Sequence, residues 1–123
     1  PMQLALANYL ATKSYDSHLR KLRRTLAQRK DIALQSLHTH LPKQVKIHYA
    51  QGGYFLWIEL PAHLNATDLY YRSLEHKISI APGKMFSAST QYNNYFRFNT
   101  SYAWTDKSEQ GVITLAGIIR ELL

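Results

Sequence analysis

The stretch NNYFRFNTS, from Asn93 to Ser101, is the most aromatic and most strand-like run of the chain. Successive side chains of a strand point to opposite faces, so alternate residues share a face. One face is expected to carry Phe96, Phe98 and Thr100, and the other Tyr95, Arg97 and Asn99. The two phenylalanines predict a face that packs on a core. Arg97 therefore projects from the opposite face, either into water or into a site that uses a planar cation.

Three more strands are expected before this stretch. VKIHY, from Val45 to Tyr49, alternates apolar and polar residues, and YFLWIEL, from Tyr54 to Leu60, is rich in aromatic and branched residues. The turn between them contains Gly52 and Gly53, where glycine permits positive φ, so the two runs predict an antiparallel hairpin. The third run, ISIAPG, predicts a short strand that ends at Pro82.

Apolar residues at spacings of three and four predict the first helices. LALANYLA, from Leu4 to Ala11, predicts a short helix, and the run TKSYDS after it is rich in capping residues. A second, long amphipathic helix is predicted from Leu19 to Leu41. Pro42 ends it, because proline disfavours the helical conformation of the preceding residue. This second helix is expected to be the longest element.

A shorter helix with a complete start signal is expected in LNATDLYYRSLEHK. Asn65 is the predicted N-cap, with Asp68 three residues further on. Leu64 and Leu69 occupy the two positions of a hydrophobic staple. These signals predict a helix from about Ala66 to His76.

The last helix is expected in TDKSEQGVITLAGIIRELL, where Asp106 and Glu109 have the spacing of a capping box. Its expected buried face consists of Val112, Ala116, Ile119 and Leu123. The predicted order is therefore helix, helix, strand, strand, helix, strand, strand, helix. This order predicts an α+β fold, in which helices cover a small, mainly antiparallel sheet.

Length and composition indicate one domain, since 123 residues that are 46% hydrophobic can bury a core of their own. The chain has no cysteine, which excludes disulfides and thiolate metal sites. No apolar run approaches the roughly 20 residues of a membrane span, so a cytoplasmic protein is expected. The chain begins at Pro1 within a helical pattern, and we expect it to be part of a longer protein.

The formal net charge of +7 and the pI of about 9.7 are compatible with an anionic partner such as nucleic acid. Six of the fifteen basic residues lie in one short stretch of the long helix: Arg20, Lys21, Arg23, Arg24, Arg29 and Lys30. This stretch forms either a solvated helix face or a phosphate-binding surface. The solvated face is the preferred interpretation, because charge runs on helices are usually solvated.

The residues offer no complete catalytic apparatus. QGGYF and APGKMF lack the spacing and the strand-to-helix context of a phosphate-binding loop. His38 and His40 point to different sides of a helix, so no metal site is expected. No spacing marks a nucleophile or a general base, and no catalytic residue is assigned. Phe55 and Trp57 are interpreted as packing residues.

The ordered motifs GGYFLWIELP, ISIAPGKMF and YFRFNTS resemble the C-terminal small domain of fold-type I pyridoxal-phosphate (PLP) aminotransferases. The resemblance spans nearly the whole chain. The preceding PMQLALANYL and YDSHLRKLRRTLAQRKD look most like the MocR subfamily of GntR transcriptional regulators. In that subfamily an aminotransferase-like module follows a DNA-binding winged helix. The resemblance thus implies one domain over residues 1–123, with residues 1–14 as a linker helix from a preceding large domain.

The resemblance also implies roles for particular residues. In these aminotransferases the arginine of the strand matching YFRFNTS binds the α-carboxylate of the amino acid, and Arg97 occupies that position. Asn99, on the same face, is a weaker candidate for the same ligand, because a local hydrogen bond is an equal alternative. The lysine and aspartate that hold PLP belong to the large domain, and Lys84 is no substitute. PLP is therefore expected in the full-length protein but not on this chain.

Three functions follow as hypotheses. The first is a PLP-binding transcriptional regulator, homodimeric at full length, that senses an amino acid and binds DNA through its winged helix. The second is a genuine aminotransferase that moves an amino group between an amino acid and a 2-oxo acid. The third is an RNA-binding sheet on which Tyr95, Phe96 and Phe98 stack bases, although the element order does not match that module. By itself the chain is expected to be catalytically silent.

Overall fold

A computed structural model describes residues 2–49, 53–76, 80–83 and 92–123, with side chains of the first helix described from residue 12. Three helices and four strands occur in these residues. In chain order they are α1 Met2–His40, β1 Lys46–Tyr49, β2 Phe55–Glu59, α2 Ala66–Glu75, β3 Ala81–Pro82, β4 Tyr95–Asn99 and α3 Asp106–Leu122. None of the described helices combines the length and the apolar character that crossing a membrane requires.

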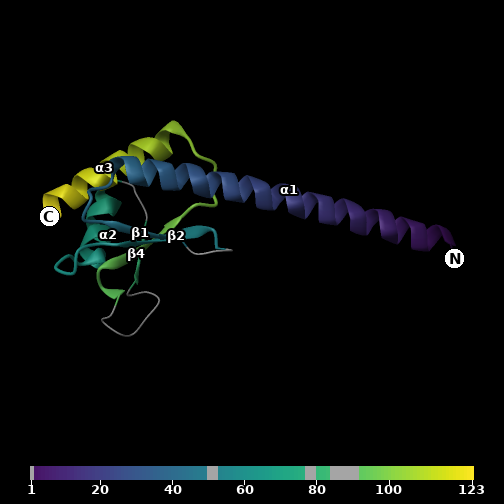
Figure 1. Ribbon diagram of the computed structural model, residues 1–123, viewed down its shortest axis with the longest axis horizontal. Coiled ribbons are helices and arrows are strands. Elements are labelled where there is room, and N and C mark those ends of the chain that lie inside the picture. The colour runs from purple at the N-terminus through teal and green to yellow at the C-terminus, as the bar shows by residue number, and fades with distance from the viewer. Residues whose placement is uncertain (1, 50–52, 77–79, 84–91) are drawn as a thin grey trace.

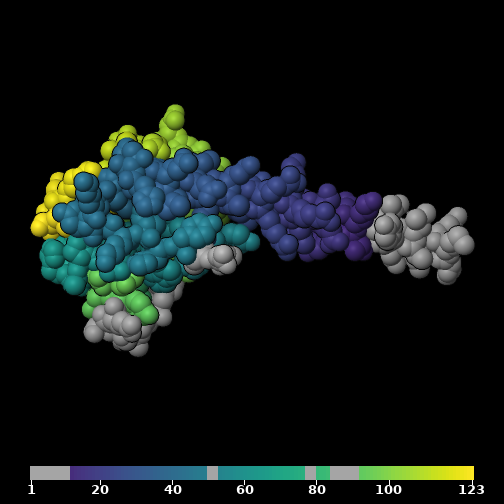
Figure 2. Space-filling view, viewed as in Figure 1, coloured from purple at the N-terminus to yellow at the C-terminus, as the bar shows by residue number. Residues whose placement is uncertain are grey.

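The first helix is one continuous element of 39 residues, so the prediction of two separate helices was wrong. The run TKSYDS contains neither proline nor glycine, and each of its residues costs a helix only a few tenths of a kcal/mol relative to alanine. Such a cost does not break a helix. The predicted long helix from Leu19 to Leu41 is confirmed as part of α1, the longest element. Its first half extends far from the rest of the molecule (Figures 1 and 2).

The four strands form one antiparallel sheet in the order β1-β2-β4-β3, which confirms the predicted α+β fold. The predicted hairpin is present as the pair β1 and β2. The short strand predicted to end at Pro82 is present as β3, and Pro82 is its last residue. Proline cannot donate a ladder hydrogen bond, and β3 is an edge strand, where such a residue is tolerated. Residues 78 and 79 of the predicted strand, and Gly52 of the turn, lie outside the described residues.

One face of the sheet packs against all three helices. Phe96 of β4 and Leu56 and Ile58 of β2 are fully buried on this face. They belong to a single core cluster with Leu37 of α1, Leu69 of α2 and the residues Val112, Leu115 and Ile119 of α3. The alternation predicted for β4 is therefore confirmed for Phe96. Thr100, just beyond the strand, is also buried.

The predicted start of α2 is confirmed. The side-chain oxygen of Asn65 accepts a hydrogen bond of 2.8 Å from the backbone N–H of Thr67. Leu64 and Leu69, the two residues of the expected staple, are both buried in the core cluster. The cap and the staple together fix the direction in which the chain enters the helix.

The predicted cap of α3 was placed one residue too late. Thr105 is the N-cap, and it forms a capping box with Ser108. Glu109 instead accepts hydrogen bonds of 2.8 Å from the Trp104 indole N–H and 2.8 Å from the imidazole of His40, which joins the end of α1 to α3. Leu123, expected on the buried face, is 43% exposed because the helix ends at Leu122.

The basic stretch of α1 divides into two groups. Arg20, Lys21, Arg23 and Arg24 are exposed, as the solvated interpretation predicts. Lys30 is only 4% exposed, and its ammonium group donates a 2.9 Å hydrogen bond to the carbonyl of Gly53 and lies 4.1 Å from the ring centre of Tyr49. Burial lowers the pKa of Lys30, and the neighbouring Asp31 partly opposes this shift.

Arg29 makes a second connection from the same helix, since its guanidinium donates a 2.8 Å hydrogen bond to the carbonyl of Ser101. Arg29 and Lys30 therefore fasten α1 to the segment after β4 and to the turn before β2. The sequence offered two interpretations of the basic stretch, a solvated helix face and a phosphate-binding surface, and neither applies to these two residues. Their role in the structure is to hold the helix against both central strands.

Replacing Lys30 with methionine is expected to destabilise the chain. Methionine keeps an apolar stem but loses a hydrogen bond from a charged donor, which typically contributes about 1.5–3 kcal/mol. The measurement is the free energy of unfolding from a urea titration. Lys21→Met, at an exposed position of the same helix, is the control and should change that free energy by less than about 0.5 kcal/mol. Equal effects of the two substitutions would contradict the connection assigned to Lys30.

Candidate functional site

The face of the sheet opposite the core presents an ordered row of side chains. In the register of the sheet, Trp57 of β2 lies directly opposite Arg97 of β4. His48 of β1 lies opposite Trp57 on its other side, and Ala81 of β3 lies opposite Arg97. Directly opposed residues of antiparallel strands share a face. A row therefore crosses all four strands, with the arginine between an aromatic residue and a small one.

Arg97 is half-buried on this face, where the alternation of β4 predicted it. Its guanidinium carbon lies 4.8 Å from the ring centre of Phe55, a cation–π arrangement that orients the side chain. Arg97 also lines a hollow of about 300 Å³. The other lining residues are Gly53, Tyr54, Phe55, Asn99 and Ser101.

Asn99 lies in the same hollow as Arg97, so the structure brings both predicted site residues together. Its side-chain oxygen accepts hydrogen bonds of 2.7 Å from both the backbone N–H and the hydroxyl of Ser101. This is the local hydrogen bonding that the sequence left as an alternative. The amide NH₂ is then the group with which Asn99 could donate to a ligand.

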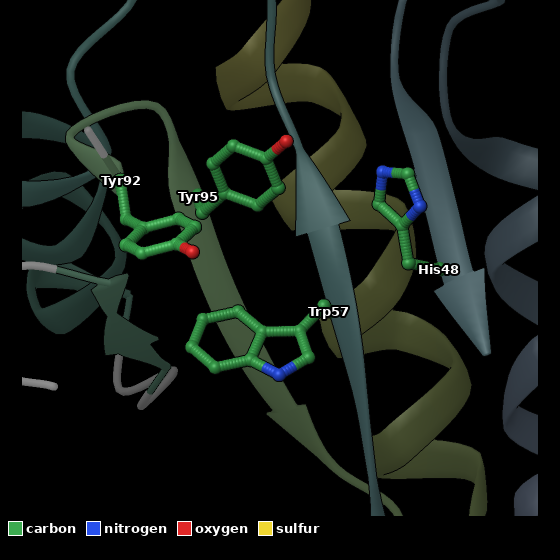
Figure 3. Close-up of a pocket in the computed structure, with 4 residues that line it drawn as sticks. All are labelled: His48, Trp57, Tyr92 and Tyr95. Carbon is green, nitrogen blue, oxygen red and sulfur yellow. The ribbon is translucent and has the colours of Figure 1, made fainter. Parts of the chain in front are cut away.

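A second hollow, of about 390 Å³, lies on the same face of the sheet, and Figure 3 shows the side chains that line it. Its walls are the side chains of His48, Trp57, Tyr92 and Tyr95. The ring centres of Tyr92 and Tyr95 are 5.4 Å apart at an interplanar angle of 84°. The Trp57 ring lies 6.4 Å from each of them. Three aromatic rings thus surround one space.

Sequence reasoning missed this second hollow. Trp57 was interpreted as a packing residue, although the period of a strand already places it on the side of Arg97, away from Leu56 and Ile58. That alternation was the available signal. Tyr92 carried no signal, because it precedes β4 and no periodicity applies to it.

Close backbone packing beside β3 fixes the position of Tyr92. A Cβ atom added at Gly83 would lie 2.5 Å from the carbonyl oxygen of Tyr92 and 3.1 Å from that of Tyr95. Only glycine allows the two segments to approach this closely. Gly83 therefore helps to set the aromatic wall of the second hollow.

A hydrogen-bonded carboxylate links two walls of this hollow. One oxygen of Glu59 accepts a 2.9 Å hydrogen bond from the hydroxyl of Tyr95 and lies 2.8 Å from the imidazole Nε2 of His48. The hydrogen bonds from His48 and then Tyr95 hold the pKa of Glu59 below its usual value. The same bond from Tyr95 to Glu59 raises the pKa of the Tyr95 phenol.

Other chemistries find no support in the described part of the chain. No group of three or more histidine, cysteine, aspartate or glutamate residues could hold a metal ion there. The RNA-binding hypothesis required Phe96 and Phe98 to stack on bases. Phe96 is completely buried, and Phe98 packs on the core with its ring 6.4 Å from that of Trp104. The position of Lys84 lies outside the described residues.

Comparisons with known proteins give two kinds of relative. No protein-family model matches the chain. The uncharacterized HTH-type transcriptional regulator YdcR of Escherichia coli is 54% identical over 123 residues, which are all of this chain and 26% of YdcR. The 2-aminoadipate transaminase of Thermus thermophilus is 32% identical over 120 residues, 96% of this chain and 30% of that enzyme. The chain therefore spans about a quarter to a third of these relatives.

Solved structures agree with the sequence relatives. The α-aminoadipate aminotransferase LysN of Thermus thermophilus, in complex with N-(5'-phosphopyridoxyl)-L-leucine, superposes with a TM-score of 0.82 at 28% identity. The match covers 92% of this chain and 29% of LysN. The kynurenine aminotransferase of Pyrococcus horikoshii gives a TM-score of 0.79 at 30% identity, over 88% of this chain and 27% of that enzyme.

The fold and these similarities define the class of the chain, which is the small domain of an aminotransferase-like protein. It is similar over nearly its whole length to HTH-type transcriptional regulators and to aminotransferases. The resemblance inferred from the motifs is thereby confirmed. The structure of the kynurenine aminotransferase contains PMP, and that of LysN contains N-(5'-phosphopyridoxyl)-L-leucine.

The hydrogen bond between Glu59 and Tyr95 predicts a pH dependence. Because the folded-state pKa of Glu59 is lowered, its stabilising contribution is present above the ordinary carboxyl pKa of 4.5 and is lost as the pH falls through the lowered value. The raised pKa of Tyr95 acts at the other end, with a contribution present below pH 10.0 and lost as the pH rises through the raised value.

Glu59→Gln is therefore expected to lower the pKa of Tyr95 toward that of an ordinary tyrosine. The measurement is an alkaline titration followed by NMR of ¹³C-labelled tyrosine rings, with the Tyr95 signal assigned by its loss in Tyr95→Phe. Glu75→Gln, at an exposed position of α2, is the control and should leave the Tyr95 signal unchanged. A Tyr95 pKa that is the same in wild type and Glu59→Gln would refute the hydrogen bond as its cause.

Proposed function

We propose that in the full-length protein this domain binds the α-carboxylate of an amino acid through Arg97. The observation that carries the proposal is the position of Arg97, at the centre of β4, on the face opposite the core and in a hollow shared with Asn99. A carboxylate is the ligand that best matches a guanidinium held on a rigid strand, because two parallel N–H groups meet both oxygens.

The neighbours of Arg97 support this role. The Phe55 ring packs on the guanidinium from one side and orients it. Asn99 presents a second, neutral donor to the same hollow, and the bonds from Ser101 fix its orientation. In this arrangement Arg97 supplies the charge and the paired geometry. Asn99 contributes orientation.

The cofactor proposed for the full-length protein is PLP, held by a large domain that precedes this chain. The donors described here, a guanidinium and an amide beside a hollow, fit a carboxylate. Lys30 is a poor candidate for a cofactor-binding lysine, because it is buried and its ammonium group donates to the carbonyl of Gly53. When bound, PLP supplies an electron sink for the α-carbon of an amino acid. This domain's share is to bind and orient that amino acid.

The proposed biological role is a PLP-binding transcriptional regulator of the MocR type, cytoplasmic and homodimeric. The 54% identity to an HTH-type regulator over the whole chain favours this role. In the proposal an N-terminal winged helix, outside this chain, binds DNA. The first part of α1, which extends from the body in Figure 1, serves as the linker helix from the large domain. An amino acid is the effector.

The second candidate is a genuine PLP-dependent aminotransferase that converts an amino acid to a 2-oxo acid. The 32% identity to a 2-aminoadipate transaminase supports it. Both candidates use Arg97 in the same way. They differ upstream of this chain, where a winged helix followed by a large domain indicates a regulator and a large domain alone indicates an enzyme.

Arg97 substitutions in the full-length protein test the carboxylate role. Arg97→Lys keeps the charge but loses the paired geometry, so it should weaken amino-acid binding while leaving cofactor attachment intact. Arg97→Ala should cost more, on the order of 2–3 kcal/mol, or about thirty- to 150-fold in affinity. Folding should change little, because the core lies on the other face of β4. The measurement is the absorbance change of the bound cofactor as candidate amino acids are added.

Arg72→Ala, at an exposed position of α2, is the matched control and should bind amino acids like wild type. Wild-type binding by Arg97→Ala, or its unfolding, would assign Arg97 a structural role and overturn the proposal.

The exposed basic residues of α1 give a separate prediction about DNA. If duplex recognition belongs to a winged helix outside this chain, the chain alone should bind DNA only weakly, without sequence preference and with strong dependence on salt. The measurement is fluorescence anisotropy with unrelated duplexes at low and at physiological salt. Sequence-selective binding that is lost in Arg20→Ala/Arg24→Ala would instead place DNA recognition in α1.

A further inference from the structure

We propose that the hollow formed by His48, Trp57, Tyr92 and Tyr95 holds the side chain of the bound amino acid, and that the ligands are neutral amino acids with an aromatic side chain. This inference rests on the proposed function, because it takes Arg97 as the anchor of the α-carboxylate. It adds the class of the ligand and assigns specificity to Trp57 and Tyr92.

The register of the sheet places this hollow within reach of the carboxylate anchor. Trp57 and Arg97 are directly opposed, and such residues have Cβ atoms about 4.5–5.5 Å apart. Tyr95 lies two residues before Arg97 on the same face of β4, about 7 Å along the strand. An amino acid whose carboxylate contacts the guanidinium can therefore place its side chain beside the Trp57 ring.

The arrangement of the rings suits an aromatic guest. Trp57, Tyr92 and Tyr95 meet one another at angles of 31°, 74° and 84°, so both faces and edges of rings border the space. Aromatic rings prefer offset and edge-to-face contacts, which add stability beyond the apolar area that they bury. The hollow, at about 390 Å³, has room for such a ring.

The surrounding charges disfavour other side chains. Arg97 lies opposite Trp57 on the neighbouring strand, and Lys46 of β1 lies opposite Glu59, so a cationic side chain would have like charges nearby. The carboxylate of Glu59 would repel an acidic side chain, and it is already engaged by Tyr95 and His48. A neutral ring avoids both conflicts. Its edge could also carry a hydroxyl or amino group toward the polar atoms of His48 and Tyr95.

The test compares three amino acids on the full-length, cofactor-loaded protein by isothermal titration calorimetry. They are L-phenylalanine, L-cyclohexylalanine and L-alanine. Cyclohexylalanine has a ring of similar size without π electrons, so it separates aromatic contacts from burial. Phenylalanine should bind more tightly than cyclohexylalanine by about two- to tenfold. Equal or tighter binding of cyclohexylalanine would overturn the assignment of aromatic ligands.

Substitutions then test which residues produce the preference for an aromatic side chain. Trp57→Leu and Tyr92→Leu should each weaken phenylalanine binding about three- to tenfold and leave alanine binding within about twofold. Tyr71→Leu removes an exposed ring from α2 and is the control that should affect neither ligand. Circular dichroism establishes that each variant folds, and Tyr92, at 38% exposure, provides the test if Trp57→Leu does not. Equal losses for phenylalanine and alanine in the folded variants would overturn the inference.

These outcomes are distinct from a failure of the proposed function. Suppose that Arg97→Ala no longer binds any of the three amino acids, and that neither Trp57→Leu nor Tyr92→Leu selectively weakens phenylalanine binding. The carboxylate role of Arg97 would then stand, and only the side-chain site would be overturned. Unchanged binding in Arg97→Ala would overturn the carboxylate role, and with it the inference that rests on it.

Discussion

Burial of one face of β2 and β4 against the helices is the constraint on which the rest of the structure depends. Phe96 and Ile58 are register partners, and both are fully buried in the cluster that α1, α2 and α3 complete. Because strand side chains alternate strictly, this burial forces Trp57 and Arg97 onto the opposite face as partners. A shift of one residue in the register would bury the arginine and expose the phenylalanine. The core thus positions the candidate site without touching it.

The connections made by α1 convert this two-layer arrangement into a rigid platform. Lys30 and Arg29 donate from the helix to the backbone carbonyls of Gly53 and Ser101, at the end of the sheet where β2 begins and β4 ends. At the other end of the same helix, His40 and Glu109 join α1 to α3. A guanidinium can orient a carboxylate only if its own backbone does not move, and β4 is held by a neighbour on both sides and by the helix layer behind it.

The two hollows of the open face combine different physical chemistry. Arg97 and Asn99 offer charge and hydrogen-bond donors, whereas Trp57, Tyr92 and Tyr95 offer aromatic surface. Phe55 contacts both groups, since its ring lies 4.8 Å from the guanidinium and 6.1 Å from Trp57. A polar anchor beside an apolar space is the usual composition of a small-molecule site. The same division is what the recognition of an amino acid requires.

The sequence by itself determined the strands, the start of α2, the α+β class and the face on which Arg97 lies, because these features depend on local periodicity and capping. It predicted a break in α1 that is absent, since weak helix formers do not end a helix, and it placed the α3 cap one residue late. Only the tertiary structure decided that Lys30 is buried, that Pro82 lies within an edge strand and that Tyr92 joins Trp57 and Tyr95. These outcomes depend on contacts between residues far apart in the chain, which no local pattern records.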